Sequence, residues 1–274
     1  MRHWCQIPRK WLRVALICHS VINEFGDQVK RDTGVLEIGS GPTGSVAAGV
    51  AHHAFGCMAK MWDKCLHRRM DLTCMPGFVG AAKHILSICP SGGLYVSLDC
   101  KMWIWLTTVV HGRSKRCLKG DVGHPEVRQA NESMDVVMWL MILAWMRGLS
   151  IWFETPRSSW AMDYLRKHQM DWLLCHAKTT WLQAYGAPWA KPLRILSSES
   201  LVMQLKGKPT GRSKSKLTQR SGVWITGKPI ALAQSAVYTS SFGMAIGKLI
   251  GQQMLRDDIP MPTFNPMLVL KVLA

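Results

Sequence analysis

One stretch near the N-terminus constrains the fold of this 274-residue chain more than any other. Residues 35–38 (Val-Leu-Glu-Ile) read as a short buried strand, and residues 46–51 read as the start of a helix. Between them, Gly39, Gly41 and Gly44 form a G-x-G-x-x-G pattern. Glycines at this spacing let the chain turn sharply, let a ligand approach the backbone, and start a helix that packs on the sheet. The stretch therefore predicts a strand–turn–helix unit that can hold a ligand.

Acidic residues accompany this turn. Glu37 lies on the strand just before Gly39, and Asp63 ends a second apolar stretch, residues 57–62, 24 residues after Gly39. An acid at the end of the second strand can take the two hydroxyl groups of a ribose. Pyrophosphate cofactors are less favoured by this pattern. A Rossmann-like turn that binds nothing has the same glycines, so that alternative stays open.

Two later strands also end in residues with useful chemistry. Residues 94–98 read as a buried strand followed by Asp99 and Cys100, and residues 149–153 read as another strand followed by Glu154. Ligands bind at the carboxyl ends of the strands in open α/β sheets. We therefore expect Cys100 and Glu154 to lie beside the glycine turn.

Strands and helices alternate at least five times along the chain. This order predicts an α/β fold, namely a Rossmann-like, doubly wound, mainly parallel sheet with helices on both faces, followed by a basic C-terminal extension. The expected organisation is an N-terminal helical arm (1–30), a Rossmann-like domain (31–200), a basic flexible linker (201–221) and a C-terminal extension (222–274).

The charge balance favours an anionic partner. The formal net charge is +17 with a pI of about 9.8, which makes nucleic acid, an anionic membrane surface or an acidic partner plausible. Residues 200–256 contain nine Lys or Arg and no Asp or Glu. Within them, residues 206–216 have the composition of a flexible tether. The candidate nucleic-acid contacts there are Lys206, Lys208, Arg212, Lys214 and Lys216, and a solvated tether that binds nothing is the alternative.

The spacing of the cysteines and the length of the apolar runs argue against several classes of protein. The nine Cys are odd in number and include no C-x-x-C pair, so neither a disulfide framework nor a zinc ribbon is indicated, and we expect no metal site. Reduced thiols favour an intracellular location, in the nucleus or cytoplasm. The longest apolar run, residues 136–146, is too short to span a bilayer, so we expect no membrane segment. The oligomeric state is not indicated.

Four sites, in this order, resemble a known family: the turn at residues 37–44, Asp99-Cys100, the Glu-Thr-Pro at 154–156, and the Tyr-Gly-Ala-Pro at 185–188. The acids around the turn resemble class I S-adenosylmethionine (SAM)-dependent methyltransferases. The whole set most resembles a degenerate DNA cytosine-5 methyltransferase and is similar to uncharacterised methyltransferase-like proteins of unicellular algae. The resemblance covers about residues 34–196.

The resemblance implies a SAM-dependent methyltransferase that acts on nucleic acid. Glu37 would lie near the amino-acid end of the cofactor, and Asp71 would face its adenine, although Asp71 could equally cap a helix. The implied cofactor-binding residues are Glu37, Gly39, Gly41, Gly44, Asp63 and Asp71.

The same resemblance implies catalytic roles for Cys100 and Glu154. A thiolate that adds to carbon 6 of cytosine makes carbon 5 nucleophilic, and a carboxylic acid on ring nitrogen 3 stabilises the developing charge. The base must first be flipped out of a duplex. Cys100 would be the nucleophile, Glu154 would hold the base, and Arg113 would touch phosphate.

The chain departs from the family at several motif positions. Leu98-Asp99 stands where the family has Pro-Pro before the nucleophile, and Thr155 stands where it has Asn. Asp99 beside Cys100 is expected to raise the thiol pKa. In the last motif, Trp189 replaces Gln, and Lys191 and Leu193 replace Arg. Three hypotheses therefore stay open: an enzyme, a catalytically degenerate nucleic-acid-binding module, and a non-functional remnant.

Overall fold

The structure is a computed structural model that describes residues 6–53, 57–188, 191–208, 215–218, 222–225, 228–230 and 238–255. Its α-helices are α1 (Leu12–Phe25), α2 (Ser45–His53), α3 (Met75–Leu86), α4 (Thr108–His111), α5 (Pro125–Met146), α6 (Ala161–Lys167) and α7 (Ser240–Met254). Its short 3-10 helices are η2 (Arg9–Trp11), η3 (Arg68–Met70), η4 (Trp105–Thr107), η5 (Leu182–Tyr185) and η6 (Ser200–Gln204).

Six strands form the central sheet in the order β2-β1-β3-β4-β6-β5. They are β1 (Thr33–Ile38), β2 (Met58–Trp62), β3 (Ile88–Ser97), β4 (Ser150–Pro156), β5 (His176–Trp181) and β6 (Pro192–Ser197). The pairs β2-β1, β1-β3 and β3-β4 are parallel, whereas β6 runs antiparallel to both β4 and β5. A separate three-stranded sheet contains β7 (Ser215–Thr218), β8 (Gly222–Ile225) and β9 (Lys228–Ile230).

The order of the strands reverses between β1 and β3. From β1 the chain passes to β2 on one side and then crosses to β3 on the other side of β1. In open α/β sheets such a reversal leaves a ligand crevice at the carboxyl ends of the two strands. The sheet confirms the expected α/β fold with an open, mainly parallel sheet, and it is compatible with the Rossmann-like class.

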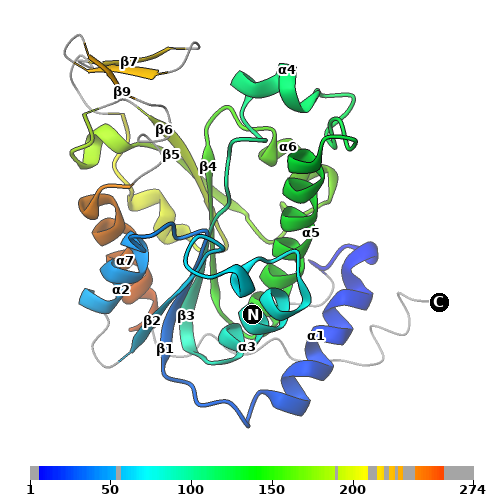
Figure 1. Ribbon diagram of the computed structural model, residues 1–274. Coiled ribbons are helices and arrows are strands. Elements are labelled where there is room, and N and C mark those ends of the chain that lie inside the picture. Colours follow the sequence, from blue (N-terminus) through cyan, green and yellow to red (C-terminus); the bar gives the residue numbers. More distant parts are fainter. Residues whose placement is uncertain are drawn as a thin grey trace.

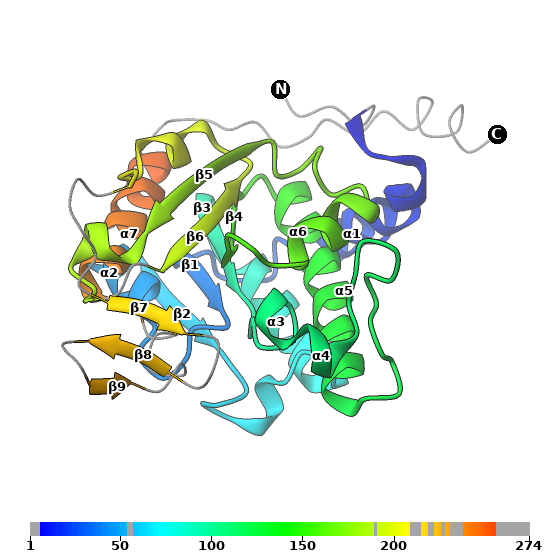
Figure 2. The ribbon, with the colours of Figure 1, turned by 90° about the horizontal axis from the view of Figure 1, so that it is seen from above.

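Helices cover both faces of the sheet (Figures 1 and 2). Side chains alternate along each strand, so Leu36 and Ile38 of β1 join the core beneath α1, α3 and α5. Val35 on the same strand joins a second core with α2 and α7. Figure 1 shows α2 and α7 on one side of the sheet and α1, α3 and α5 on the other.

Helices α2 and α7 lie side by side with their backbones in contact (Figure 1). Gly49 of α2 meets Gly243 and Gly247 of α7. A Cβ atom added at Gly247 would lie 2.2 Å from the carbonyl carbon of Gly49. The absence of side chains at these positions lets α7 approach closely enough to cover the sheet.

This packing corrects the expected C-terminal extension. Helix α7 is a layer of the main domain, because Phe242, Ile246 and Ile250 are buried in the same core as α2. The expected linker is also partly built into the domain, since η6 buries Leu201 and Val202. The expected arm at 1–30 packs on α5 through α1. Residues 256–274 lie outside the described residues.

Two strands differ from expectation. The antiparallel strand β6 falls where the sequence suggested only a motif. Strand β3 begins at Ile88, six residues before the strand expected at 94–98, and its added part contains an irregularity. Thr33 of β1 pairs with Ile88 and Val35 pairs with Gly93, which means that residues 89–92 bulge out of the parallel ladder. Ser91 in this bulge has a φ of 60°.

Over the part of the chain that the structure describes, no helix is both long and apolar enough to cross a membrane. The longest helix, α5, has 22 residues but begins with polar turns that include Glu126 and Arg128. Its second half is the apolar run that the sequence predicted, and the domain core buries most of it.

Candidate functional site

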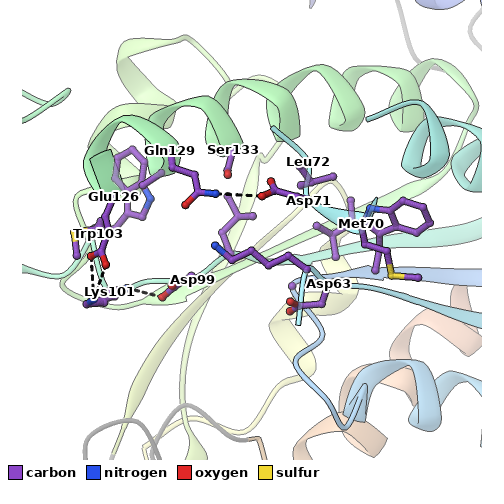
Figure 3. Close-up of a pocket in the computed structure, with 17 residues that line it drawn as sticks. Asp63, Met70, Asp71, Leu72, Asp99, Lys101, Trp103, Glu126, Gln129 and Ser133 are labelled. Atoms are coloured by element: carbon purple, nitrogen blue, oxygen red, sulfur yellow. Dashed lines mark hydrogen bonds and ion pairs between the residues drawn. The ribbon is translucent and has the colours of Figure 1, made fainter. Parts of the chain in front are cut away.

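A crevice lies at the carboxyl ends of β1, β2 and β3, where the strand order reverses (Figure 3). It brings together Gly39 after β1, Asp63 after β2 and Asp99 after β3. Its remaining charged and polar lining comes from residues 64, 71 and 101 and from the start of α5. The residues that complete the lining are Ile38, Trp62, Lys64, Met70, Asp71, Leu72, Leu98, Lys101, Met102, Trp103, Glu126, Gln129, Ala130 and Ser133.

All three glycines of the turn have left-handed backbones, with φ values of +73° at Gly39, +60° at Gly41 and +50° at Gly44. Packing also demands two of them. A Cβ atom on Gly39 would lie 1.8 Å from the carbonyl oxygen of Ser97, and one on Gly44 would lie 2.2 Å from the sulfur of Met61. A Cβ atom on Gly41 would have no neighbour within 4 Å. Of these three glycines, Gly41 is therefore the one whose backbone another molecule can approach.

Carboxylates of the protein itself accept hydrogen bonds from backbone amides in and just after this turn. Oε2 of Glu37 accepts a hydrogen bond from the amide of Ala47 (2.7 Å), in the first turn of α2. The amide of Gly41 donates to Oδ2 of Asp63 (2.9 Å), and that of Gly44 donates to the carbonyl of Ser40 (3.3 Å). Loops that bind phosphate instead leave such amides free for the ligand. The turn is therefore poorly suited to a pyrophosphate.

Burial controls the protonation of Glu37. Its side chain is fully buried, and this burial raises its pKa from 4.5 to about 7. The negative charge of Asp63 raises the pKa further, whereas the amides of Val46 and Ala47 lower it. Oε1 of Glu37 is buried and has no hydrogen-bond partner. Glu37 does not line the crevice. It lies beneath the turn, where its carboxylate caps the first turn of α2.

Hydrogen bonds from neighbouring residues hold the carboxylates of Asp63 and Asp71 in place. Asp63 accepts from the amides of Gly41 and Cys65 (2.8 Å for the latter). Oδ1 of Asp71 accepts from the amide and hydroxyl of Thr73, at 2.9 and 2.7 Å. Oδ2 of Asp71 accepts from the side-chain amide of Gln129 at 3.2 Å, a contact drawn in Figure 3. A carboxylate has about four acceptor positions, so both can still bind a ligand.

The crevice is acidic although the chain is strongly basic. Four carboxylates line it, and Lys64 and Lys101 are the cations among its lining residues. Lys101 forms an ion pair with Glu126 at 2.9 Å (Figure 3). A crevice lined by an excess of carboxylates attracts cations and repels phosphates. The four carboxylates are those of Asp63, Asp71, Asp99 and Glu126.

Glu154 belongs to a buried polar cluster on the other face of the sheet. Ser97, its partner on β3, donates a hydrogen bond to Oε2 at 2.7 Å. The hydroxyl of Tyr238 contacts the same oxygen and lies 2.5 Å from the hydroxyl of Ser97. The remaining oxygen, Oε1, is buried without a partner. Burial raises the pKa of Glu154, which favours the protonated carboxyl.

Cys100 lies within electrostatic range of Glu154 and Lys191. Burial raises the pKa of the thiol, Glu154 and Asp99 raise it further, and Lys191 lowers it. The expected effect of Asp99 has the right direction, but it is smaller than that of burial. The balance favours the neutral thiol, which is a weak nucleophile.

The expected phosphate contact at Arg113 is wrong, because this side chain is fully buried. Its guanidinium donates to the carbonyls of Met102 (2.7 Å) and Leu118 (2.5 Å) and to the side chain of Asn131 (2.9 Å). It also stacks 3.6 Å from the centre of the Trp103 ring. Arg113 therefore fixes the loop between β3 and α5 from inside.

Of the other candidate nucleic-acid contacts, the structure describes the side chains of Lys206 and Lys208. Lys206 lies over the ring of Tyr185 at 5.5 Å, on the α7 side of the domain, and Lys208 is exposed. Arg212, Lys214 and the side chain of Lys216 lie outside the described residues. Of the two candidates whose side chains are described, neither Lys206 nor Lys208 lines the crevice.

Several residues of the two clusters had no motif to mark them. Gln129 and Glu126 enter the crevice from the first turns of α5, which precede the apolar run at residues 136–146 that marks this helix in the sequence. Tyr238 reaches Glu154 from a segment 84 residues away. Among the described residues, no group of three or more His, Cys, Asp or Glu side chains could hold a metal ion.

Comparisons with protein-family models, with curated proteins and with solved structures gave no match to this chain.

Proposed function

We propose that the crevice binds S-adenosylmethionine and that the chain is a SAM-dependent methyltransferase-like protein. The observation that carries this proposal is the acidic crevice beside a turn whose amides are already taken by Glu37 and Asp63. SAM has an adenosine, a sulfonium cation, an ammonium group and one carboxylate, so its net charge is positive, and it has no phosphate. A carboxylate-lined crevice complements those charges.

The lining supplies partners for the ribose, the adenine and the cationic groups of this cofactor. Asp63, at the end of β2, takes the two ribose hydroxyl groups. Met70 and Leu72 offer apolar surface for the adenine, and Asp71 can accept a hydrogen bond from its amino group. Asp99, which also lines the crevice, attracts the sulfonium and ammonium groups of the cofactor. When bound, the cofactor supplies the methyl group.

The experiment compares three ligands by calorimetric titration of the full chain. The account predicts that S-adenosylhomocysteine and adenosine bind competitively, because both present the ribose diol and adenine. NAD+ should not bind, because the turn offers it few free amides and the crevice repels its pyrophosphate. Tighter binding of NAD+ than of adenosine would overturn the proposal.

A catalytically degenerate nucleic-acid-binding module is the second candidate function. Two observations favour it over cytosine methylation: the raised pKa of the Cys100 thiol, and the cover that Tyr238 forms over Glu154. This candidate predicts no methyl transfer from labelled SAM to cytosine-containing DNA. It also predicts that Cys100 is alkylated by iodoacetamide at pH 7.5 more slowly than the exposed Cys175.

A further inference from the structure

A second groove lies next to the crevice, past the carboxyl end of β4. Its main lining residues are Trp105, Arg157, Trp160, Arg166 and Arg194. They come from η4, from the segment after β4, from α6 and from β6. The groove and the crevice share a wall, because the segment that carries Trp103 into the crevice continues directly to Trp105.

Backbone hydrogen bonds hold the walls of the groove together. Ile104 forms a β-bridge with Ser159, and the amide of Trp160 donates to the carbonyl of Trp103 at 2.8 Å. On the opposite wall, the amide of Arg157 donates to the carbonyl of Pro192 at 3.1 Å. The arginine and tryptophan side chains are therefore presented by a fixed frame.

The groove has an excess of positive charge. Three arginines line it, and the single carboxylate among its lining residues, Asp163, pairs with Arg166 at 3.6 Å. Guanidinium groups can only donate hydrogen bonds, so a groove lined by Arg157, Arg166 and Arg194 suits an anionic ligand that is rich in acceptors.

An aromatic platform accompanies this charge. The side chain of Trp105 is 47% exposed, although it is one of the largest apolar groups of the chain. Surfaces that bind single-stranded nucleic acid combine such exposed aromatic rings, on which bases stack, with arginines that follow the backbone phosphates. An acidic peptide would use the arginines alone, and the paired bases of a duplex could not stack on Trp105.

We propose that this groove binds single-stranded nucleic acid, with a base on Trp105 and a phosphate at Arg157 and Arg194. As the docking site of a methyl acceptor, the groove rests on the proposed methyltransferase-like function. As a binding surface, it can be tested without the cofactor.

The experiment measures the fluorescence polarisation of a labelled 20-nucleotide oligothymidine with the full chain, in the absence of cofactor. Trp105→Leu should weaken binding about tenfold, because one base loses its stacking partner. Arg157→Gln should weaken binding and reduce the slope of log affinity against log salt concentration by about 0.7. Oligodeoxyuridine and oligouridine of the same length, which carry the same base, show which sugar the groove prefers, and tight binding of either strand supports the proposal.

Matched controls remove an exposed tryptophan and an exposed charge elsewhere. Trp139→Leu on α5 and Lys248→Gln on α7 should leave the affinity unchanged, since neither residue lines the groove. Unchanged binding in Trp105→Leu, equal affinity for a duplex, or full competition by polyglutamate would overturn the proposal. Failure of adenosine or S-adenosylhomocysteine to bind would overturn only the crevice proposal, so the two failures are distinguishable.

Discussion

The carboxylate of Asp63 accepts a hydrogen bond from the amide of Gly41 at 2.9 Å, and this bond ties the end of β2 to the turn after β1. The residue proposed to hold the ribose is therefore also a structural part of the turn. A variant at position 63 alters both, so ligand binding must be read together with stability.

Replacing Gly39 and Gly41 by alanine should lower the unfolding free energy by unequal amounts. Gly41→Ala should lower the unfolding free energy by about 1–2 kcal/mol, the cost of a left-handed backbone in a residue with a Cβ atom. Gly39→Ala has the same strain and also meets the carbonyl oxygen of Ser97, which adds about 1–3 kcal/mol of overpacking. Urea denaturation measures both. Equal losses would contradict the packing described at Gly39.

Glu37 should make the protein less stable as the pH rises. Its pKa is about 7 in the folded chain and 4.5 as the ordinary value, so between these pH values the folded chain binds more protons than the unfolded chain. Its contribution to the unfolding free energy therefore falls by up to about 3 kcal/mol as the pH passes from below 4.5 to above 7. Glu37→Gln, which is neutral throughout, should remove this fall.

The measurement for Glu37 is urea denaturation of both proteins at pH 5 and pH 8. Burial also raises the pKa of Glu154, and its contribution has the same sign. Only the difference between wild type and Glu37→Gln therefore isolates Glu37. The same pH dependence in both proteins would mean that Glu37 ionises normally.

The contact between α2 and α7 should not tolerate a methyl group. Gly247→Ala places a Cβ atom 2.2 Å from the backbone of Gly49 and should cost about 1–3 kcal/mol, because neither helix backbone can move without disturbing the sheet contact. Gly207→Ala is the matched control, since a Cβ atom there has no neighbour within 4 Å. Thermal melting compares the two. If both variants melt alike, α7 does not pack as described.

Arg113 should affect stability and leave nucleic-acid binding alone. Arg113→Lys cannot reach Met102, Leu118 and Asn131 together, and losing one such charged hydrogen bond costs about 1.5–3 kcal/mol. Arg116→Lys, exposed in the same loop, should be neutral. A change in the salt dependence of oligonucleotide binding in Arg113→Lys would instead support a phosphate contact.

Local patterns predicted the elements that meet at the crevice. The glycine turn, the apolar strand before it and the acid at position 63 are consecutive signals that need no distant partner. The sheet reversal then brings Gly39, Asp63 and Asp99 to one edge, where the carboxyl ends of the parallel strands meet. Asp71 was also expected there, and it lies there with the support of Gln129.

Long-range contacts decided what the sequence could not predict. Strand β6 begins with a proline and carries Arg194 at its centre, so its own pattern is weak, and it forms because β4 and β5 pair with it on both sides. Arg113 carries a charge that predicts exposure, yet carbonyls from two loop segments enclose it. Likewise, the place of Tyr238 beside Glu154 depends on how α7 docks.

The most direct test is calorimetric titration of S-adenosylhomocysteine into the wild-type chain and into Asp63→Asn. Asparagine keeps an oxygen for the amide of Gly41 and leaves the exposed amide of Cys65 to water, but it loses the charge and the acceptor capacity for two ribose hydroxyl groups. The account predicts micromolar binding to the wild type and at least about tenfold weaker binding to the variant at a similar melting temperature. No binding to a wild-type chain that melts cooperatively, or equal binding to both proteins, would contradict it.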